Sequence, residues 1–279
     1  MTVREALRAA EAQLTAAGCP DSRFDARCLG EISFGLTSTQ LRLHGERLAT
    51  EEALVRLNAL TQRRTAGEPL QYLLGRWEFF GESFWVGKGV LIPRPETELL
   101  VRAALDFLAD RDRAVVYDLC AGSGCIGLSV AKHCPGADVW LLEKSETALG
   151  YLRENTTAFA LPNIHVLPAD VLLLPDPALP PPDLLLSNPP YIPAGEIDSL
   201  QREVHQEPRL ALDGGPDGLL FYRALADLWL PLLRPGGRIS VECGEGQAEE
   251  IAALFAPVCL SVRFLRDAGG INRAVTAAR

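Results

Sequence analysis

From residue 114 onward, the chain alternates short apolar runs with stretches of helical periodicity, and this order constrains the fold more than any other feature. The runs are Val115–Leu119, Val139–Leu142, Ile164–Leu167, Leu184–Ser187, Arg238–Val241 and Val258–Phe264. The helical stretches are Ile126–His133, Ser145–Phe159, Leu219–Leu233 and Ala248–Phe255. Near-continuous apolar runs separated by helices are typical of parallel strands that are buried on both faces. The pattern therefore predicts an α/β fold with a mainly parallel sheet covered by helices on both sides.

The residues before this alternation predict a separate helical part. The apolar residues Val3, Leu7, Ala10 and Leu14 recur on one face of a first helix. The expected N-caps of further helices are Asp21, Ser38 and Thr50, and the helix after Asp21 is expected to bury Phe24, Cys28 and Ile32. These helices predict a small independent domain that ends near Gly67–Pro69.

Two elements are expected between the helical part and the alternating part. Residues 76–92 are rich in aromatic and β-branched side chains around Gly81–Ser83, which predicts a hairpin. A helix is expected from Glu96, and its apolar face is Leu99, Leu100, Ala103 and Phe107. We therefore divide the chain into a helical domain (1–75), a hairpin linker (76–92) and an α/β domain (93–279).

Composition and charge argue against several classes of protein. The chain has 27 Lys and Arg against 36 Asp and Glu, and a net charge of −9 opposes the basic face that most nucleic-acid binders need. The apolar runs are shorter than the roughly 18–20 residues of a membrane span, and the first residues lack the apolar core of a signal peptide. Seven cysteines without a Cys-x-x-Cys pair and four scattered histidines indicate neither a disulfide framework nor a metal site. We expect a cytoplasmic, monomeric protein with no membrane or DNA partner.

A glycine-rich turn lies where the first apolar run of the α/β part meets its helix. After Asp118 and Leu119 the turn contains Cys120, Ala121, Gly122, Ser123 and Gly124. Glycines at such a turn let a ligand approach the backbone beside a helix N-terminus. Glu143 ends the next run 25 positions after Asp118, near the roughly 20-residue spacing at which an acidic residue accepts ribose hydroxyls. Asp170, after the third run, is a candidate acceptor for an adenine amino group, and these features leave NAD and S-adenosylmethionine both open.

The tetrapeptide Asn188-Pro189-Pro190-Tyr191 favours the second cofactor. It follows an apolar run and so stands at the carboxyl end of a strand, where open α/β sheets bind their ligands. Two prolines fix the backbone and remove two N–H donors, which leaves the Asn188 side-chain oxygen and the Pro189 carbonyl as acceptors. A planar NH₂ group offers two matching donors, and Tyr191 supplies a flat face beside it. We therefore interpret the chain as a methyltransferase that acts on a planar nitrogen.

Matching blocks over most of the chain resemble the HemK/PrmC protein-(glutamine-N5) methyltransferases. The blocks are residues 68–75, 90–98, 188–191 and 207–219, followed by Glu242, Gly244 and Gln247. The resemblance implies a seven-stranded, Rossmann-like class I methyltransferase fold that uses S-adenosylmethionine, together with an N-terminal domain that docks the substrate. It also implies methylation of the glutamine side-chain amide (N5) in the Gly-Gly-Gln motif of class I peptide-chain release factors. The product would be S-adenosylhomocysteine, and the methylation would modulate translation termination.

The resemblance also assigns roles to individual residues. The implied cofactor-binding residues are Thr97, Asp118, Cys120, Ala121, Gly122, Ser123, Gly124, Glu143, Asp170, Val171 and Asn188. The implied catalytic residues are Asn188, Pro189 and Tyr191, and these form the glutamine pocket together with Pro190. The implied reaction is a one-step in-line transfer without a covalent intermediate or a metal, in which alignment and preorganised acceptors supply most of the rate. The chain departs from the family at Cys120, Glu143 and Val171, where glycine, aspartate and a larger residue are the more usual choices.

Some alternatives stay open from the sequence. An N6-adenine nucleic-acid methyltransferase acts on the same kind of planar NH₂ group, although the net charge is unfavourable for it. A ribosomal-protein glutamine methyltransferase would share the motifs. Cys120 and Cys125 are interpreted as packing residues rather than a redox pair. The polar group Glu203, His205 and Glu207 is interpreted as a solvated loop face or a helix cap rather than an acid/base cluster.

Overall fold

The computed structural model describes residues 1–279, which form two compact units. The first unit comprises Met1–Arg76 together with Gln201–Gln206, and the second comprises Trp77–Leu200 with Glu207–Arg279. The sequence carries no signal for the return of Gln201–Gln206 to the first unit. The functional roles given to the three sequence-defined parts stay predictions. None of the helices is both long enough and apolar enough to cross a membrane.

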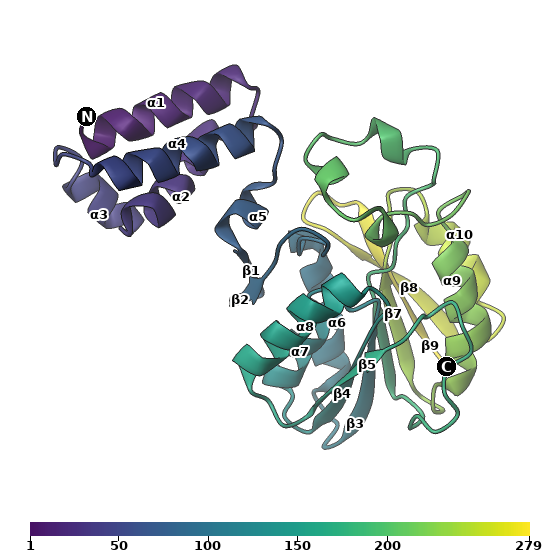
Figure 1. The fold of residues 1–279 in the computed structure, drawn as a ribbon. Helices are drawn as coiled ribbons and strands as arrows, with labels where there is room; N and C mark the ends of the chain where they lie inside the picture. Colours follow the sequence, from purple (N-terminus) through teal and green to yellow (C-terminus); the bar gives the residue numbers. More distant parts are fainter. The chain divides into compact units, whose positions relative to one another are not determined.

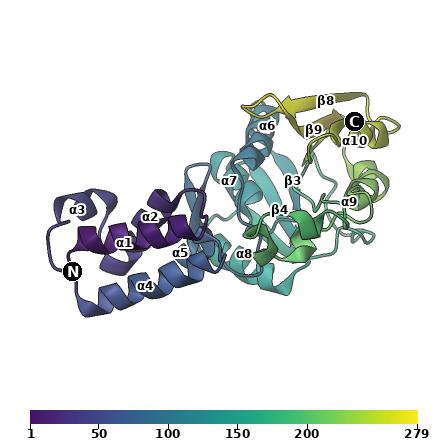
Figure 2. The ribbon, with the colours of Figure 1, turned by 90° about the horizontal axis from the view of Figure 1, so that it is seen from above.

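Five helices build the first unit (Figures 1 and 2). They are α1 (Val3–Ala16), α2 (Ser22–Phe34), α3 (Ser38–Leu43), α4 (Glu51–Thr65) and α5 (Leu70–Leu74). The predicted caps Asp21 and Thr50 accept backbone N–H groups at the starts of α2 and α4. At α3 the prediction is wrong by one residue, because Thr37 forms a reciprocal capping box with Gln40 while the Ser38 hydroxyl donates to Glu31.

The buried face of α2 also differs from the predicted one. Phe24, Cys28 and Ile32 are only half-buried. The residues that α2 buries are Asp25, Ala26, Leu29, Gly30 and Ser33. The cause is an ion pair, because Arg64 Nε on α4 donates to Asp25 Oδ2 from 2.7 Å and both side chains are less than a tenth exposed. A search for apolar periodicity misses a helix face that contains a buried charge.

The predicted hairpin is present. Strand β1 (Arg76–Phe79) and strand β2 (Glu82–Trp85) form a two-stranded sheet, and Phe80 and Gly81 turn between them with φ of 51° and 75°. The remaining predicted hairpin residues, 86–92, form no strand. A short turn, η1 (Pro95–Thr97), then leads into α6 (Glu98–Leu108), which starts two residues later than expected. Of its four predicted face residues, α6 buries Leu100 and Phe107 but not Leu99 or Ala103.

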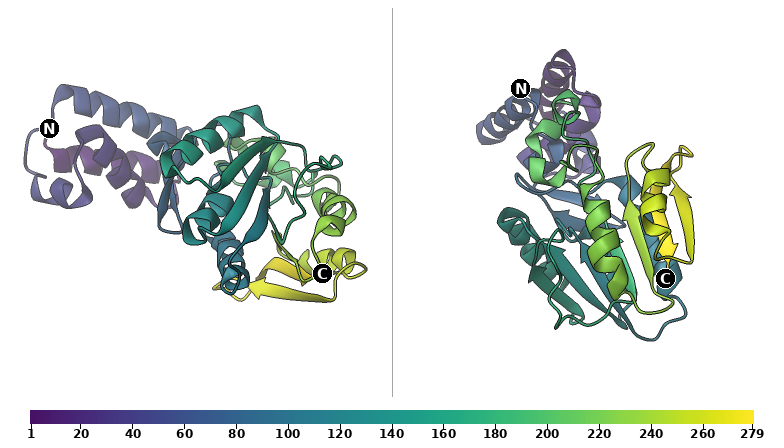
Figure 3. Two further views of the ribbon diagram at one scale, coloured as in Figure 1. Left: turned by 90° about the horizontal axis from the view of Figure 1, so that it is seen from below. Right: turned by 90° about the vertical axis from the view of Figure 1, so that its right-hand side faces the viewer.

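Seven strands form the main sheet of the second unit, in the order β5-β4-β3-β6-β7-β9-β8. They are β3 (Ala114–Leu119), β4 (Ala137–Glu143), β5 (Ile164–Pro168), β6 (Leu184–Ser187), β7 (Arg238–Glu242), β8 (Ser261–Arg266) and β9 (Asn272–Ala278). The first five strands in this order are parallel, whereas β9 and β8 are antiparallel and form the edge drawn in yellow in Figure 3. Strand β9 is absent from the predicted runs because its alanine-rich sequence carries only two β-branched residues.

Helices cover both faces of this sheet, as predicted (Figure 1). Leu184 and Leu186 of β6 pack into a core with α6, α7 and α8, whereas Leu185 packs into a second core with α9 and α10. These helices are α7 (Cys125–His133), α8 (Glu146–Phe159), α9 (Leu220–Ala224) and α10 (Ala248–Phe255). The shorter turns are η2 (Ile197–Ser199), η3 (Val204–Gln206), η4 (Arg209–Ala211), the π-turn η5 (Leu225–Trp229) and η6 (Leu230–Leu232).

Candidate active site

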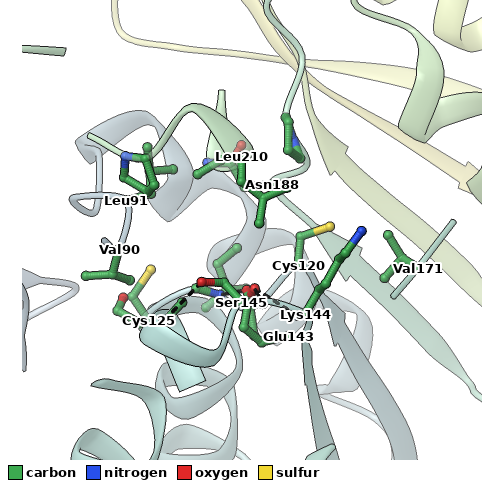
Figure 4. Close-up of a pocket in the computed structure, with 18 of the residues that line it drawn as sticks. Val90, Leu91, Cys120, Cys125, Glu143, Lys144, Ser145, Val171, Asn188 and Leu210 are labelled. Carbon is green, nitrogen blue, oxygen red and sulfur yellow. Dashed lines mark hydrogen bonds between the residues drawn. The ribbon is translucent and has the colours of Figure 1, made fainter. Parts of the chain in front are cut away.

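The sequence-predicted site segments follow the carboxyl ends of four parallel strands. These strands end at Leu119, Glu143, Pro168 and Ser187. Because the ends of parallel strands meet at one edge of a sheet, the segments after them come together. A cavity opens to solvent at this edge (Figure 4). It is lined by residues from segments 89–97, 120–126, 143–148, 169–171, 188–190 and 208–211, and by Phe221.

The turn between β3 and α7 forms one wall of this cavity. Three of its residues have positive φ: Cys120 (64°), Gly122 (57°) and Gly124 (83°). A Cβ on Gly124 would lie 2.5 Å from Leu152 Cδ1, so Leu152 would have to shift, and the positive φ disfavours any side chain at this position. Gly127, one turn into α7, is also crowded, because its Cβ would lie 2.1 Å from Leu141 Cδ2. Helix α7 thus packs closely on the sheet and its N-terminus borders the cavity.

Glu143 forms hydrogen bonds with both the glycine turn and the backbone at the start of α8. Its Oε2 accepts from the Gly122 N–H at 2.8 Å, and its Oε1 accepts from the N–H groups of Lys144 and Ser145 at 2.9 and 2.7 Å. A carboxylate offers about four acceptor directions, so one direction on Oε2 is left for a ligand. A ribose that binds through both of its hydroxyls would have to displace one of these backbone bonds.

Asp118 is fully buried in front of the turn and does not line the cavity. Its Oδ2 accepts from the Gly127 N–H at 2.9 Å, but its Oδ1 has no hydrogen-bond partner. Burial raises the pKa of this carboxyl to about 7. Asp118 therefore holds the first turn of α7 from inside and is not part of the cavity wall.

Asp170 and Val171 line the cavity after β5. Partial burial works to raise the pKa of Asp170, but Lys144 Nζ at 2.7 Å and the Leu172 N–H outweigh it and lower the pKa. Val171 is buried, and its carbonyl accepts from the indole N–H of Trp229 at 2.9 Å. The Asp170 side chain is thus already engaged by a cation, while Val171 presents an apolar wall (Figure 4).

The tetrapeptide follows β6 as predicted, but only part of it faces the cavity. Asn188 and Pro190 line the cavity, whereas Pro189 and Tyr191 are not among the lining residues. Tyr191 accepts a bond at its carbonyl from Gln247 Nε2 at 2.9 Å, and burial raises the pKa of its phenol. The structure therefore places Asn188 and the glycine turn around one cavity, and packs Tyr191 against the 244–247 segment instead.

Comparisons with known proteins agree with this geometry. Residues 5–75 match the family model of the PrmC N-terminal domain, and residues 96–215 match that of the methyltransferase small domain. A release factor glutamine methyltransferase from Caulobacter vibrioides is 38% identical and aligns over 99% of this chain and 96% of its own. A protein of the same name from Geobacter sulfurreducens is 37% identical over 98% and 95% of the two chains, and one from Gloeobacter violaceus is 41% identical over 88% and 86%. The chain belongs to the release factor glutamine methyltransferase family.

Solved structures support the fold of this family member. The hMettl16 catalytic domain, solved with the MAT2A 3′UTR hairpin 6, superposes with a TM-score of 0.56 at 16% identity and covers 82% of each chain. A methyltransferase from Pyrococcus furiosus gives a TM-score of 0.52 at 17% identity over 72% of this chain and 90% of its own. At these identities the likeness concerns the fold alone, and it confirms the class I methyltransferase fold expected from the sequence.

Cys120 has an unusual backbone conformation for a residue with a side chain. Its φ of 64° lies in the left-handed region that favours glycine, the residue that the resemblance implies at this position. Burial raises the pKa of the Cys120 and Cys125 thiols, so the reactive thiolate form is disfavoured at both. This supports the interpretation of the two cysteines as packing residues.

The prediction that Glu207 lies on a solvated loop face or caps a helix is wrong. Its side chain is only 2% exposed, accepts from the Ile92 N–H at 3.0 Å and pairs with Arg94. It therefore joins two walls of the cavity in this family member, segments 89–97 and 208–211. Glu203 instead pairs with Arg64 inside the first unit. The polar sequence around Glu207 gives no sign of its burial.

Glu242 is one of the residues that carry the family resemblance. It is the last residue of β7, is buried, and accepts from the Thr97 hydroxyl at 2.5 Å. Thr97 Oγ1 in turn accepts from Asn188 Nδ2 at 3.1 Å. Thr97, predicted as a cofactor contact, does line the cavity, but its hydrogen bonds connect Asn188 to a buried carboxylate.

Proposed function

We propose that this protein transfers a methyl group from S-adenosylmethionine to the side-chain amide nitrogen (N5) of the glutamine in the Gly-Gly-Gln motif of class I peptide-chain release factors. One observation carries the proposal. Asn188 of the tetrapeptide lines the same cavity as the glycine turn and Glu143, in a chain that belongs to the release factor glutamine methyltransferase family. The reaction is accordingly assigned to this cavity.

The cavity residues fit S-adenosylmethionine as the methyl donor. The glycine turn offers close backbone approach to its methionine part, the free acceptor direction on Glu143 suits a ribose hydroxyl, and Val171 with Asp170 suits the adenine. When bound, the cofactor supplies an electrophilic methyl group on a sulfonium, a chemistry that needs no metal.

The tetrapeptide binds the glutamine side chain in this proposal. Asn188 Oδ1 and the Pro189 carbonyl accept the two N–H bonds of the planar amide, which turns its nitrogen lone pair toward the methyl group. In this proposal Pro190 borders that amide directly, and Tyr191 supports the pocket from outside the cavity lining, where it packs against segment 244–247. Because a fixed acceptor pair does not need to reorganise, alignment supplies most of the rate.

The proposal extends to partners and place. The helical first unit docks the release factor, and the protein acts in the cytoplasm as a monomer without DNA or membrane partners. The family match of residues 5–75 to the PrmC N-terminal domain supports an assignment of that unit to substrate recognition.

Transfer of a labelled methyl group from S-adenosylmethionine to a purified class I release factor tests the proposal. A Gln-to-Ala variant of the Gly-Gly-Gln motif, ribosomal protein and duplex DNA run in parallel. Label on the native factor alone is expected. Equal label on the Gln-to-Ala variant, or label on ribosomal protein or DNA instead of the factor, would overturn the substrate assignment in favour of the corresponding alternative.

Glu143→Gln is expected to weaken cofactor binding by roughly 10- to 100-fold and to change kcat at saturating cofactor much less. The amide keeps one acceptor oxygen but must point an NH₂ group at backbone N–H donors, so charge-assisted bonds worth about 1.5–3 kcal/mol are lost. Calorimetric titration with S-adenosylhomocysteine measures the effect. Asp138→Asn is the matched control on the same strand, because Asp138 pairs with His165 and does not line the cavity. Equal affinities of Glu143→Gln and wild type would remove Glu143 from the cofactor site.

A further inference from the structure

A buried row of polar side chains links the cavity to the interior of the sheet. Ser187 of β6 pairs in register with Val241 of β7, so the next residues along the two strands, Asn188 and Glu242, lie side by side. Thr97 bridges them, with Glu242 Oε2 2.5 Å and Asn188 Nδ2 3.1 Å from its Oγ1. Thr97 and Glu242 are 2% and 4% exposed. Thr97 and Asn188 line the cavity, whereas Glu242 does not.

The donor and acceptor roles within this row determine the orientation of the Asn188 side-chain amide. An ionised carboxylate only accepts hydrogen bonds, so Thr97 must donate its single O–H to Glu242. The Thr97 oxygen can then only accept, and it accepts from the Asn188 NH₂ group. The amide NH₂ is therefore engaged by the protein, and the carbonyl oxygen Oδ1 is the atom left for a ligand.

The charge on Glu242 is costly where it lies. No Lys, Arg or His forms an ion pair with Glu242, and the nearby Arg94 is paired with Glu207 instead. Burial raises the pKa of Glu242 to about 7, and the hydrogen bond from Thr97 opposes that rise only in part. A neutral side chain would hold the threonine hydroxyl at lower cost. A buried carboxylate without a counter-ion thus needs a reason beyond packing.

We propose that Glu242 is a positioning residue for methyl transfer: acting through Thr97, it holds the Asn188 amide with its oxygen toward the substrate. This inference rests on the proposed function, since it assigns the Asn188 oxygen to the amide N–H of the target glutamine. Glu242 itself touches neither substrate nor cofactor. The Thr97 hydroxyl connects the two side chains, because it donates to Glu242 and accepts from the Asn188 amide.

Protonation of Glu242 is expected to remove the hydrogen-bond order that orients the Asn188 amide. A carboxylic acid can donate to Thr97, which frees the threonine O–H to turn toward Asn188 Oδ1 and removes the preference for one amide orientation. Several charged and titratable groups lie near Glu242 and affect its charge or are affected by it. They are Arg94 just before η1, Glu96 in η1, Tyr191 after β6, Tyr222 on α9, Cys125 on α7 and the adjacent Cys243. The active form is the ionised one, so kcat is expected to fall as the pH is lowered through about 7 while cofactor affinity is retained.

Four variants of the full-length protein test the inference. Thr97→Val removes the bridging hydroxyl at nearly constant shape and is expected to lower kcat by roughly 10- to 100-fold with little change in KM, the range typical when an outer-shell partner is removed. Thr97→Ser restores the hydroxyl and is expected to recover most of that loss. Glu242→Gln is expected to lose the fall in kcat below about pH 7. The matched control is Thr276→Val, which breaks the buried Ser240–Thr276 hydroxyl pair (2.9 Å) between β7 and β9, away from the cavity.

The side-chain amide signal of Asn188 in ¹⁵N–¹H spectra gives a readout that needs no activity. Its assignment follows from its loss in Asn188→Asp. The signal is expected to shift with pH near 7 in wild type and in Thr276→Val, but not in Thr97→Val. Equal loss of kcat in Thr97→Val and Thr276→Val would overturn the inference. An Asn188 amide signal that shifts with pH in Thr97→Val as it does in wild type would also overturn it. Failure of the wild type to methylate any release factor would instead contradict the proposed function, and the amide signal would still test the orientation.

Discussion

Asn188→Ala is expected to lower kcat by roughly 10²–10³ while the affinity for S-adenosylhomocysteine changes much less, by analogy with the loss of one preorganised polar contact. The side chain lines the cavity and its NH₂ group is held by Thr97, so its oxygen is fixed before substrate arrives. Alanine removes that acceptor and leaves the glycine turn and Glu143 in place. Single-turnover transfer to a release factor and calorimetric titration with S-adenosylhomocysteine measure the two quantities separately.

The control for this prediction is a second asparagine of the same domain. Asn163 donates from Nδ2 to the carbonyls of Ala131 and Ala137 and lies outside the cavity. Asn163→Ala therefore removes a comparable set of hydrogen bonds at a position outside the cavity, and its kcat is expected to stay near that of wild type. Unchanged turnover in Asn188→Ala, or an equal loss in both variants, would remove Asn188 from the chemistry.

The parts of the molecule that could be predicted from sequence depend on neighbours along the chain. Buried parallel strands are recognisable in the sequence as apolar runs. The residues that follow each run meet at one edge of the sheet, and this does not depend on the sequence of the intervening loops. For this reason the glycine turn, Glu143, Asp170 and Asn188 were expected together, and the structure brings them to one cavity. Their individual roles toward cofactor and substrate stay predictions.

The parts that could not be predicted depend on pairs that are distant in sequence. Thr97 lies 145 positions from Glu242 and 91 from Asn188, so no local pattern signals that the three form a row. The buried Glu207 resembles any loop glutamate until Arg94 and the Ile92 N–H are seen to bind it. Strand β9 was missed for a different reason, because its position in the sheet rather than its propensity makes it a strand.

Arg64→Met is expected to lower the local unfolding free energy of the first unit by about 3–5 kcal/mol, because it leaves the buried Asp25 carboxylate without its partner. Arg64 also donates to Glu203 at 3.0 Å and to the Glu68 carbonyl at 3.3 Å, so one side chain serves three acceptors. Native-state hydrogen exchange of amides in α2 and α4 measures the change. Arg63→Met is the neighbouring control, since its pair with Glu68 is exposed and worth no more than about 1 kcal/mol.

A double variant, Asp25→Leu with Arg64→Met, separates the buried charge from the rest of the Arg64 contacts. Replacing both members of a buried ion pair by apolar residues is often neutral, so protection in α2 and α4 is expected to return close to that of wild type. Glu203 loses its partner in the single and the double variant alike, so exchange in Gln201–Gln206 is expected to stay faster in both. If the double variant is as unstable as Arg64→Met in α2 and α4, the stability of the helical unit depends on the arginine's other contacts and not on neutralising Asp25.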